Sequence, residues 1–137
     1  MWIVYALLAA FFAALVAIFA KIGIEGVNSN LAVAIRTVIV LLMAWLIVFV
    51  TGKHGEISAI SQKCWIFLIL SGLATGISWL FYYKALQVGD ASKVVPIDKL
   101  SIVITMILAF VFLGETASVK TIIGGLFIVG GTVVLIF

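Results

Sequence analysis

The 137-residue sequence has few charged residues, a single cysteine, a single proline and a single histidine. Asp, Glu, Lys and Arg make up 9% of it, whereas about a quarter of an ordinary soluble domain is charged. Hydrophobic residues make up 66%. A chain this short cannot hide them from water, because small domains bury only about two-thirds of the surface that their unfolded chains expose. The composition excludes a water-soluble globule and leaves lipid as the solvent.

The same scarcities exclude several classes of function. The lone Cys64 forms no internal disulfide and no cysteine metal cluster, and one histidine with five scattered acids is too few for most catalytic constellations. No metal-ligand spacing, nucleophile elbow or phosphate loop is present. The eight bases are spread singly and lack the clustering of a nucleic-acid surface. We expect no enzyme, no catalytic residue, no metal, no cofactor and no nucleic-acid partner.

Long apolar runs dominate the rest of the sequence. A helix that crosses roughly 30 Å of hydrocarbon needs about 20 largely apolar residues. Five such runs predict transmembrane helices over about residues 2–21, 31–50, 64–87, 94–113 and 119–137 of a single domain, residues 1–137. None of them has the polar face that a soluble bundle requires. The fold class is therefore an all-α membrane protein, and we expect its first run to stay as an anchor rather than be removed as a signal peptide.

Local signals mark several helix ends. Gly89 is a natural helix terminator, and Ser92 and Ser118 are expected to cap the fourth and fifth helices. The single proline, Pro96, is expected near the beginning of the fourth helix, where its missing N–H costs least. Residues 51–63 form the one sizeable polar loop.

Small residues recur at helical spacing on three of the expected helices. In lipid, such residues let helix backbones approach closely and become the signal for association. They are predicted helix-packing positions, either within one subunit or in a dimer contact: Ala10, Ala14, Ala17, Gly72, Gly76, Gly124 and Gly131.

Three ionisable side chains lie at membrane depth, where a charge costs at least about 2.5 to 3.5 kcal/mol. Arg36 is about 9 Å along the second helix. It either snorkels to the headgroups or faces inward to pair with a carboxylate or contact a substrate. Asp98 and Lys99 follow Pro96. Asp98 either complements the positive end of the fourth helix or belongs to a pathway with Lys99.

The third and fourth helices each carry a row of polar side chains at intervals of three or four residues. The two rows either line a hydrated pathway or bond to their own backbone carbonyls, as membrane Ser and Thr often do. Trp79 and Tyr83 either close such a pocket or belong to an interfacial aromatic belt. The rows are Ser71, Thr75, Ser78 and Tyr82 on the third helix, and Asp98, Ser101 and Thr105 on the fourth.

The orientation of the chain in the membrane is weakly specified. Five crossings place the termini on opposite sides, and the bases in or near the loops tie at three on each side. Counting the deeper Arg36 and Lys99 makes the division five to three. The chain therefore inserts with its amino terminus outside, or inserts both ways and pairs with an inverted copy.

Several of these segments together resemble the EamA domain of the drug/metabolite transporter superfamily, in particular its short, single-domain, five-helix bacterial and archaeal members. The resemblance covers nearly the whole chain. Its most specific parts are Arg36 early in the second helix, the entry Ala91-Ser-Lys-Val-Val-Pro96 and the pair Gly114-Glu115. It extends through Tyr82-Tyr-Lys-Ala-Leu86, Asp98-Lys-Leu-Ser101 and Gly124-Gly125.

The resemblance implies five helices that form half of an inverted-repeat, ten-helix transporter in the bacterial or archaeal cytoplasmic membrane. It implies a secondary transporter that moves a small metabolite by alternating access, as an antiparallel homodimer or with a related five-helix subunit. Its partners would be a small-molecule substrate and membrane lipid. A lipid-carrier flippase is the alternative within this class, and a non-transporting membrane scaffold or regulatory subunit is the alternative outside it.

Overall fold

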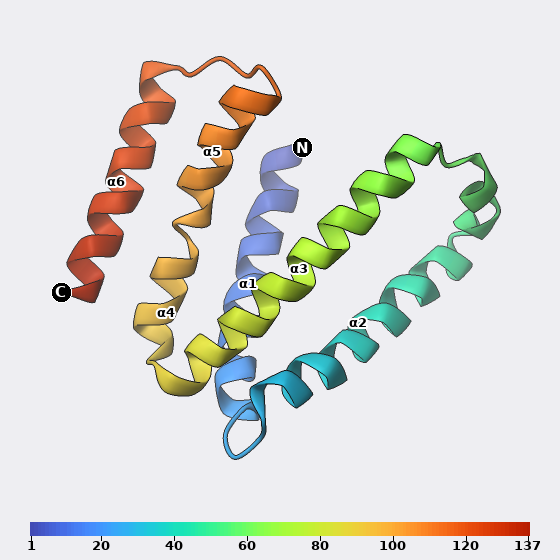
Figure 1. Cartoon of the computed structure of the whole chain (residues 1–137), viewed down its shortest axis with the longest axis horizontal. Coiled ribbons are helices and arrows are strands. Elements are labelled where there is room, and N and C mark those ends of the chain that lie inside the picture. Colours follow the sequence, from blue (N-terminus) through green and yellow to red (C-terminus); the bar gives the residue numbers. More distant parts are fainter. The chain divides into compact units, whose positions relative to one another are not determined.

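The computed structural model describes all 137 residues, and every regular element in it is a helix (Figure 1). Five stretches are long and apolar enough to cross a membrane, with α4 and α5 together forming the fourth. The all-α membrane fold class is thereby confirmed. The elements are α1 (Trp2–Gly23), α2 (Ser29–Val50), the 3-10 helix η1 (Lys53–Ala59), α3 (Gln62–Val88), α4 (Ala91–Asp98), α5 (Ser101–Phe112) and α6 (Val119–Ile136).

Most of the large apolar side chains are exposed. Trp2, for example, is 76% exposed, and Leu86 is the one large side chain that is fully buried. Such a surface would be strongly unfavourable in water, because apolar area costs roughly 25 cal/mol per Å². Helices that are apolar on all sides are typical of membrane spans, where lipid covers the outward faces.

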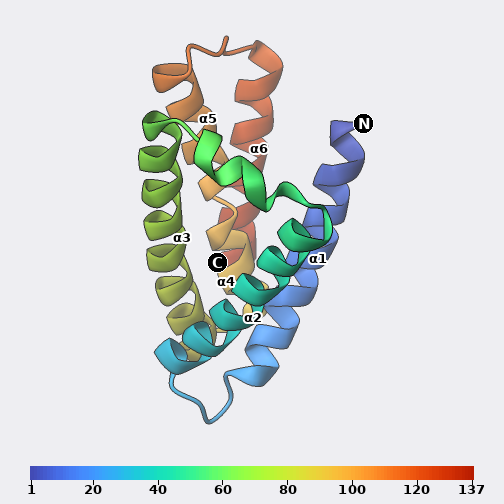
Figure 2. The ribbon, with the colours of Figure 1, turned by 90° about the vertical axis from the view of Figure 1, so that its right-hand side faces the viewer.

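The chain divides into two compact units, and the division falls within α1. The helix-pair unit, residues 19–88, holds α2 and α3, which pack against each other and are joined through η1. Figure 2 gives a second view of this pair. The terminal unit comprises residues 1–18 and 89–137, and in it both α4 and α5 pack against α6.

Side-chain caps explain where two helices begin. The Asn28 side chain accepts hydrogen bonds from the N–H groups of Asn30 and Leu31 at 2.9 and 3.3 Å, so α2 begins two residues earlier than expected. Ser118 accepts from the Thr121 N–H at 3.1 Å, and the predicted cap of α6 is confirmed. The predicted terminator Gly89 directly follows α3.

The fourth predicted helix is not continuous. It begins at Ala91 with Asp90 as its N-cap, so the prediction of a Ser92 cap is wrong and Pro96 lies inside α4. After the proline, the Leu100 N–H bonds to the Ile97 carbonyl at 3.0 Å, three residues back, rather than to Pro96. A proline inside a helix disturbs the regular ladder of hydrogen bonds. Downstream of the proline, the chain tightens at residues 99–100 and continues as α5.

The Pro96 carbonyl, released from the ladder, finds a partner on α6. The Thr132 hydroxyl approaches it at 3.4 Å and also donates to the Ile128 carbonyl of its own helix at 2.8 Å. Thr132 is 4% exposed. The single hydroxyl proton is shared, and the contact with Pro96 is the longer arm of a three-centre hydrogen bond. It gives the Pro96 carbonyl a protein partner where lipid offers none.

Candidate functional site

Arg36 lies against aromatic rings of the neighbouring helix in the helix-pair unit. Its guanidinium carbon is 3.9 Å from the centre of the Trp79 ring and 5.6 Å from that of Tyr83. Both rings belong to α3, where residues four apart share a face. Contacts at these distances are cation–π interactions. The structure therefore brings together three residues that the sequence had singled out separately.

The surroundings of these rings are packed. Tyr83 is 4% exposed, Trp79 and Arg36 are half-buried, and the Tyr82 ring meets Tyr83 edge-on at 6.3 Å between centres. Thr37, next to Arg36, returns its hydroxyl to the Val33 carbonyl of its own helix at 2.7 Å. Within this unit, the positive charge of Arg36 interacts with the faces of aromatic rings and not with a carboxylate.

The remaining members of the α3 row are exposed. Ser71, Thr75 and Ser78 all lie on the surface of the chain. Thr75 donates to the Ser71 carbonyl at 2.8 Å, so this hydroxyl bonds to its own backbone. The row belongs to the helix-pair unit, whereas Asp98, Ser101 and Thr105 belong to the terminal unit. A hydrated path lined by both rows stays a prediction.

Asp98 and Lys99 form a neighbouring ion pair at the end of α4. The Lys99 ammonium is 3.3 Å from an Asp98 carboxylate oxygen, and both side chains are partly exposed. Asp98 ends α4 and therefore does not complement the helix N-terminus, as one interpretation had it. Ser101 and Thr105 of α5 instead line a shallow hollow of about 390 Å³ with Met106 and Glu115. Asp98 is not among the residues that line this hollow.

The predicted packing residues differ in burial. On α6 the buried positions are Gly125 and Thr132, while Gly124 is half-buried and Gly131 exposed. Gly125 packs at van der Waals distance from Met106 of α5, because a Cβ at this position would lie 3.7 Å from the Met106 sulfur. The remaining positions are buried Ala17, half-buried Gly76, and exposed Ala10, Ala14 and Gly72.

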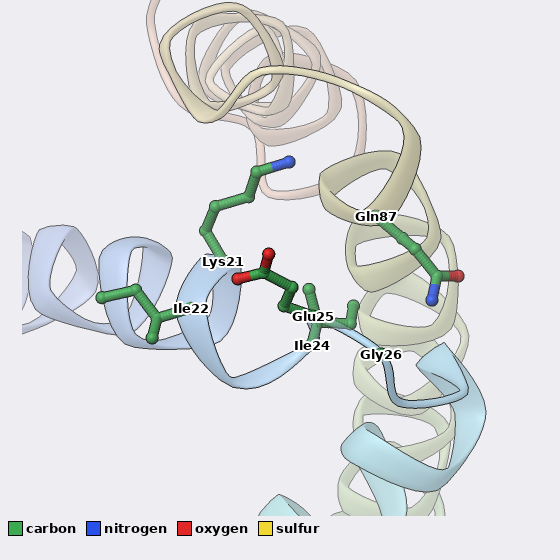
Figure 3. Close-up of a pocket in the computed structure, with 6 residues that line it drawn as sticks. All are labelled: Lys21, Ile22, Ile24, Glu25, Gly26 and Gln87. Atoms are coloured by element: carbon green, nitrogen blue, oxygen red, sulfur yellow. The ribbon is translucent and has the colours of Figure 1, made fainter.

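A second polar cluster, absent from the sequence predictions, lies where α1, the following turn and the end of α3 meet. Lys21 donates to the Leu86 carbonyl at 2.6 Å, and the Gln87 amide donates to the Val27 carbonyl at 2.8 Å. A cavity of about 440 Å³ lies beside them, with Glu25 on its wall (Figure 3). The one sequence signal for this cluster was a base in the last turn of α1. The carbonyl that it contacts lies 65 residues away in the sequence, so the contact itself was not predicted.

Comparison with known proteins places this architecture in a family. The profile of the EamA-like transporter family matches residues 1–137. A protein described as an uncharacterized transporter in the cobO 3′ region of Sinorhizobium sp. is 48% identical over 134 residues, 98% of this chain and 95% of that protein. An uncharacterized protein of Methanocaldococcus jannaschii is 34% identical over 103 residues, 69% of this chain and 75% of that protein. No solved structure gives a significant match. The chain, a multi-pass membrane protein, belongs to the EamA-like transporter family.

Proposed function

We propose that this protein is a secondary transporter that moves a small metabolite by alternating access, with Arg36 in its solute pathway. The observation that carries the proposal is the cation–π contact between Arg36 and Trp79 at 3.9 Å. Arg36 lies seven residues inside α2, hence about 10 Å from its start. A charge kept at that depth is a functional group by default, because it costs free energy to insert.

The direction of the Arg36 side chain supports an inward-facing role over snorkelling. The hydrogen bond from the Gln87 side chain to the Val27 carbonyl places the end of α3 beside the start of α2. Trp79 lies nine residues before the end of α3 and Tyr83 five, which is about 13 and 8 Å along the helix. The guanidinium group is closer to the deeper ring, Trp79. A snorkelling arginine would extend toward the shallower one.

A second subunit completes the proposal. Five spans are half of the inverted ten-helix arrangement that many transporters use, with the solute site between the halves. The near-even distribution of bases in the sequence suits insertion in both directions. The protein would then work as an antiparallel homodimer or with a related five-helix subunit. Exposed Ser71, Ser78 and Gly131 are available to such a partner.

Transport itself is tested with purified protein in liposomes that are loaded with a mixture of small metabolites. We expect at least one solute to leave or exchange faster than from protein-free liposomes, as measured by mass spectrometry of the external medium. Transfer of lipid-linked solutes alone would instead indicate a flippase. Absence of any protein-dependent movement, with a stoichiometric unrelated protein copurifying, would indicate a scaffold.

The antiparallel arrangement has a direct test in the native cysteine. Cys64 is the single cysteine, it is exposed, and it lies at the start of α3 next to the polar loop. A membrane-impermeant maleimide added to intact cells, with and without prior permeabilisation, reports which side it faces. Labelling of about half the molecules from each side is the expected result. Labelling from one side alone would contradict dual insertion and favour a related partner subunit.

A further inference from the structure

We propose that Arg36 binds an oxyanion of the transported solute, a carboxylate or phosphate group, through the edge of its guanidinium group. The inference rests on the proposed transport function and names the class of solute. Three observations support it: the contact of Arg36 with Trp79, the lack of a neutralising carboxylate in the helix-pair unit, and the net positive charge of that unit.

The aromatic contact leaves the hydrogen-bond donors of Arg36 unused. Its guanidinium carbon lies over the Trp79 ring, 3.9 Å from the ring centre, and a cation–π contact does not use the N–H donors. The five N–H donors lie in the guanidinium plane and match the two oxygens of a carboxylate or phosphate. Thus the ring fixes the position of the group while its edge remains available for a ligand.

No carboxylate in the helix-pair unit neutralises Arg36. The two acids of this unit are Glu25, in the turn after α1, and Glu56 in η1. Glu56 pairs with Lys53 at 2.6 Å. The other bases near this end of the pair are Lys21, which donates to the Leu86 carbonyl, and Lys84, which donates to the Gln87 side chain. The charge of Arg36 therefore lacks a counter-ion from its own unit.

The net charge of the chain lies entirely in this unit. Residues 19–88 contain five bases and two acids, whereas residues 1–18 and 89–137 contain three of each. The formal charge of +3, to which Arg36 itself contributes, is thus carried by the unit that holds the Arg36 site. Such a field attracts anions and repels cations, and it acts more strongly where the dielectric constant is low. The cation–π contact does not remove the charge, so an anionic ligand supplies the missing partner.

The test uses Trp79 as a reporter. A variant in which Trp2, Trp45 and Trp65 are replaced by Phe keeps Trp79 as its single tryptophan. It is purified in dodecyl maltoside, which contains no phosphate, and titrated at constant ionic strength with succinate, inorganic phosphate or choline chloride. We expect a saturable change in Trp79 emission with succinate or phosphate and none with choline. A saturable response to choline alone, or no response to either oxyanion, would overturn the proposal.

Matched substitutions assign the response to Arg36. Arg36→Gln is expected to weaken the apparent affinity about 10- to 100-fold, the effect of losing a charge-assisted hydrogen bond, while Arg36→Lys retains part of it. Lys63→Gln removes one charge of the same unit from the exposed start of α3 and should change affinity less than about twofold. Gel filtration and circular dichroism verify that each variant is folded. Equal loss in Arg36→Gln and Lys63→Gln would mean a general charge effect and overturn the site.

Two further arms separate the sources of the oxyanion and the two proposals. Phosphatidylglycerol added to the micelles without succinate or phosphate tests whether a lipid headgroup is the ligand. A response to this lipid alone would overturn a dissolved solute as the ligand. Oxyanion binding without solute movement in liposomes would leave the site standing and reject the transport function. Movement of cations alone, without oxyanion binding, would support the transport function and reject the oxyanion site.

Discussion

The Thr132 hydroxyl of α6 lies 3.4 Å from the Pro96 carbonyl of α4, three residues before the break in the fourth span at residues 99–100. Inside a membrane, a carbonyl that leaves the helical ladder needs a protein partner. The broken helix and the buried threonine therefore form one structural feature. It also fixes α6 against the helix that precedes the break.

Replacing Thr132 by valine removes this partner at nearly constant volume. We expect Thr132→Val to lower the stability of the purified protein by about 1 kcal/mol, in the range measured for hydrogen bonds between membrane helices. Unfolding in detergent, followed by circular dichroism, measures the change. Thr75→Val is the matched control, because the Thr75 hydroxyl bonds to its own helix. Equal effects of the two substitutions would contradict a role for the contact between helices.

Lys21 stabilises the end of α3. Its ammonium group donates to the Leu86 carbonyl at 2.6 Å, where unpaired carbonyls give a helix its partial negative charge. Lys21→Met should therefore lower the melting temperature, with a loss of roughly 1 to 2 kcal/mol. Lys84→Met is the control, since exposed Lys84 contacts a side chain one turn away, Gln87, at 3.4 Å. A control that destabilises as much as Lys21→Met would contradict this capping role.

Gly125 tests the packing face of α6. An added methyl group would meet the Met106 sulfur at an ordinary 3.7 Å, so Gly125→Ala should be tolerated. Gly125→Leu should cost about 1 to 3 kcal/mol, because an overpacked interface shifts its neighbours. Gly131→Leu places the same side chain on an exposed position, and the folded monomer should be unaffected. A destabilising Gly131→Leu together with a neutral Gly125→Leu would mean that α6 packs through its other face.

Much of the fold follows from local signals. The apolar runs are long enough to predict all five spans, and the polar cap at Ser118 and the terminator at Gly89 act over a few residues. The fourth span differs from its prediction in where it begins and in the break at residues 99–100. In the predicted helix, which starts near residue 94 with Ser92 as its cap, Pro96 would lie in the first turn, but with Asp90 as the N-cap it lies inside α4.

The candidate site was less predictable, because its contacts join residues distant in sequence. Arg36 and Trp79 each stood out by their position, but their contact depends on how α2 and α3 are rotated about their axes. The same limit applies to α6. Gly124 and Gly131 were expected to pack, whereas Gly125 and Thr132 are the buried pair. Both pairs have the same spacing of seven residues, so spacing alone does not distinguish them. The pairs are offset by one residue, which corresponds to about 100° of rotation about the helix axis.

The central claim is that Arg36 acts on the solute in the membrane, and its most direct measurement is solute flux in proteoliposomes. The wild-type protein, Arg36→Gln and Lys63→Gln are reconstituted at equal density, and exchange of the solute identified for the wild type is followed. We predict that Arg36→Gln loses at least about 90% of the flux, since a loss of 1.4 kcal/mol already corresponds to tenfold, and that Lys63→Gln keeps most of it. Undiminished flux in Arg36→Gln would contradict the account.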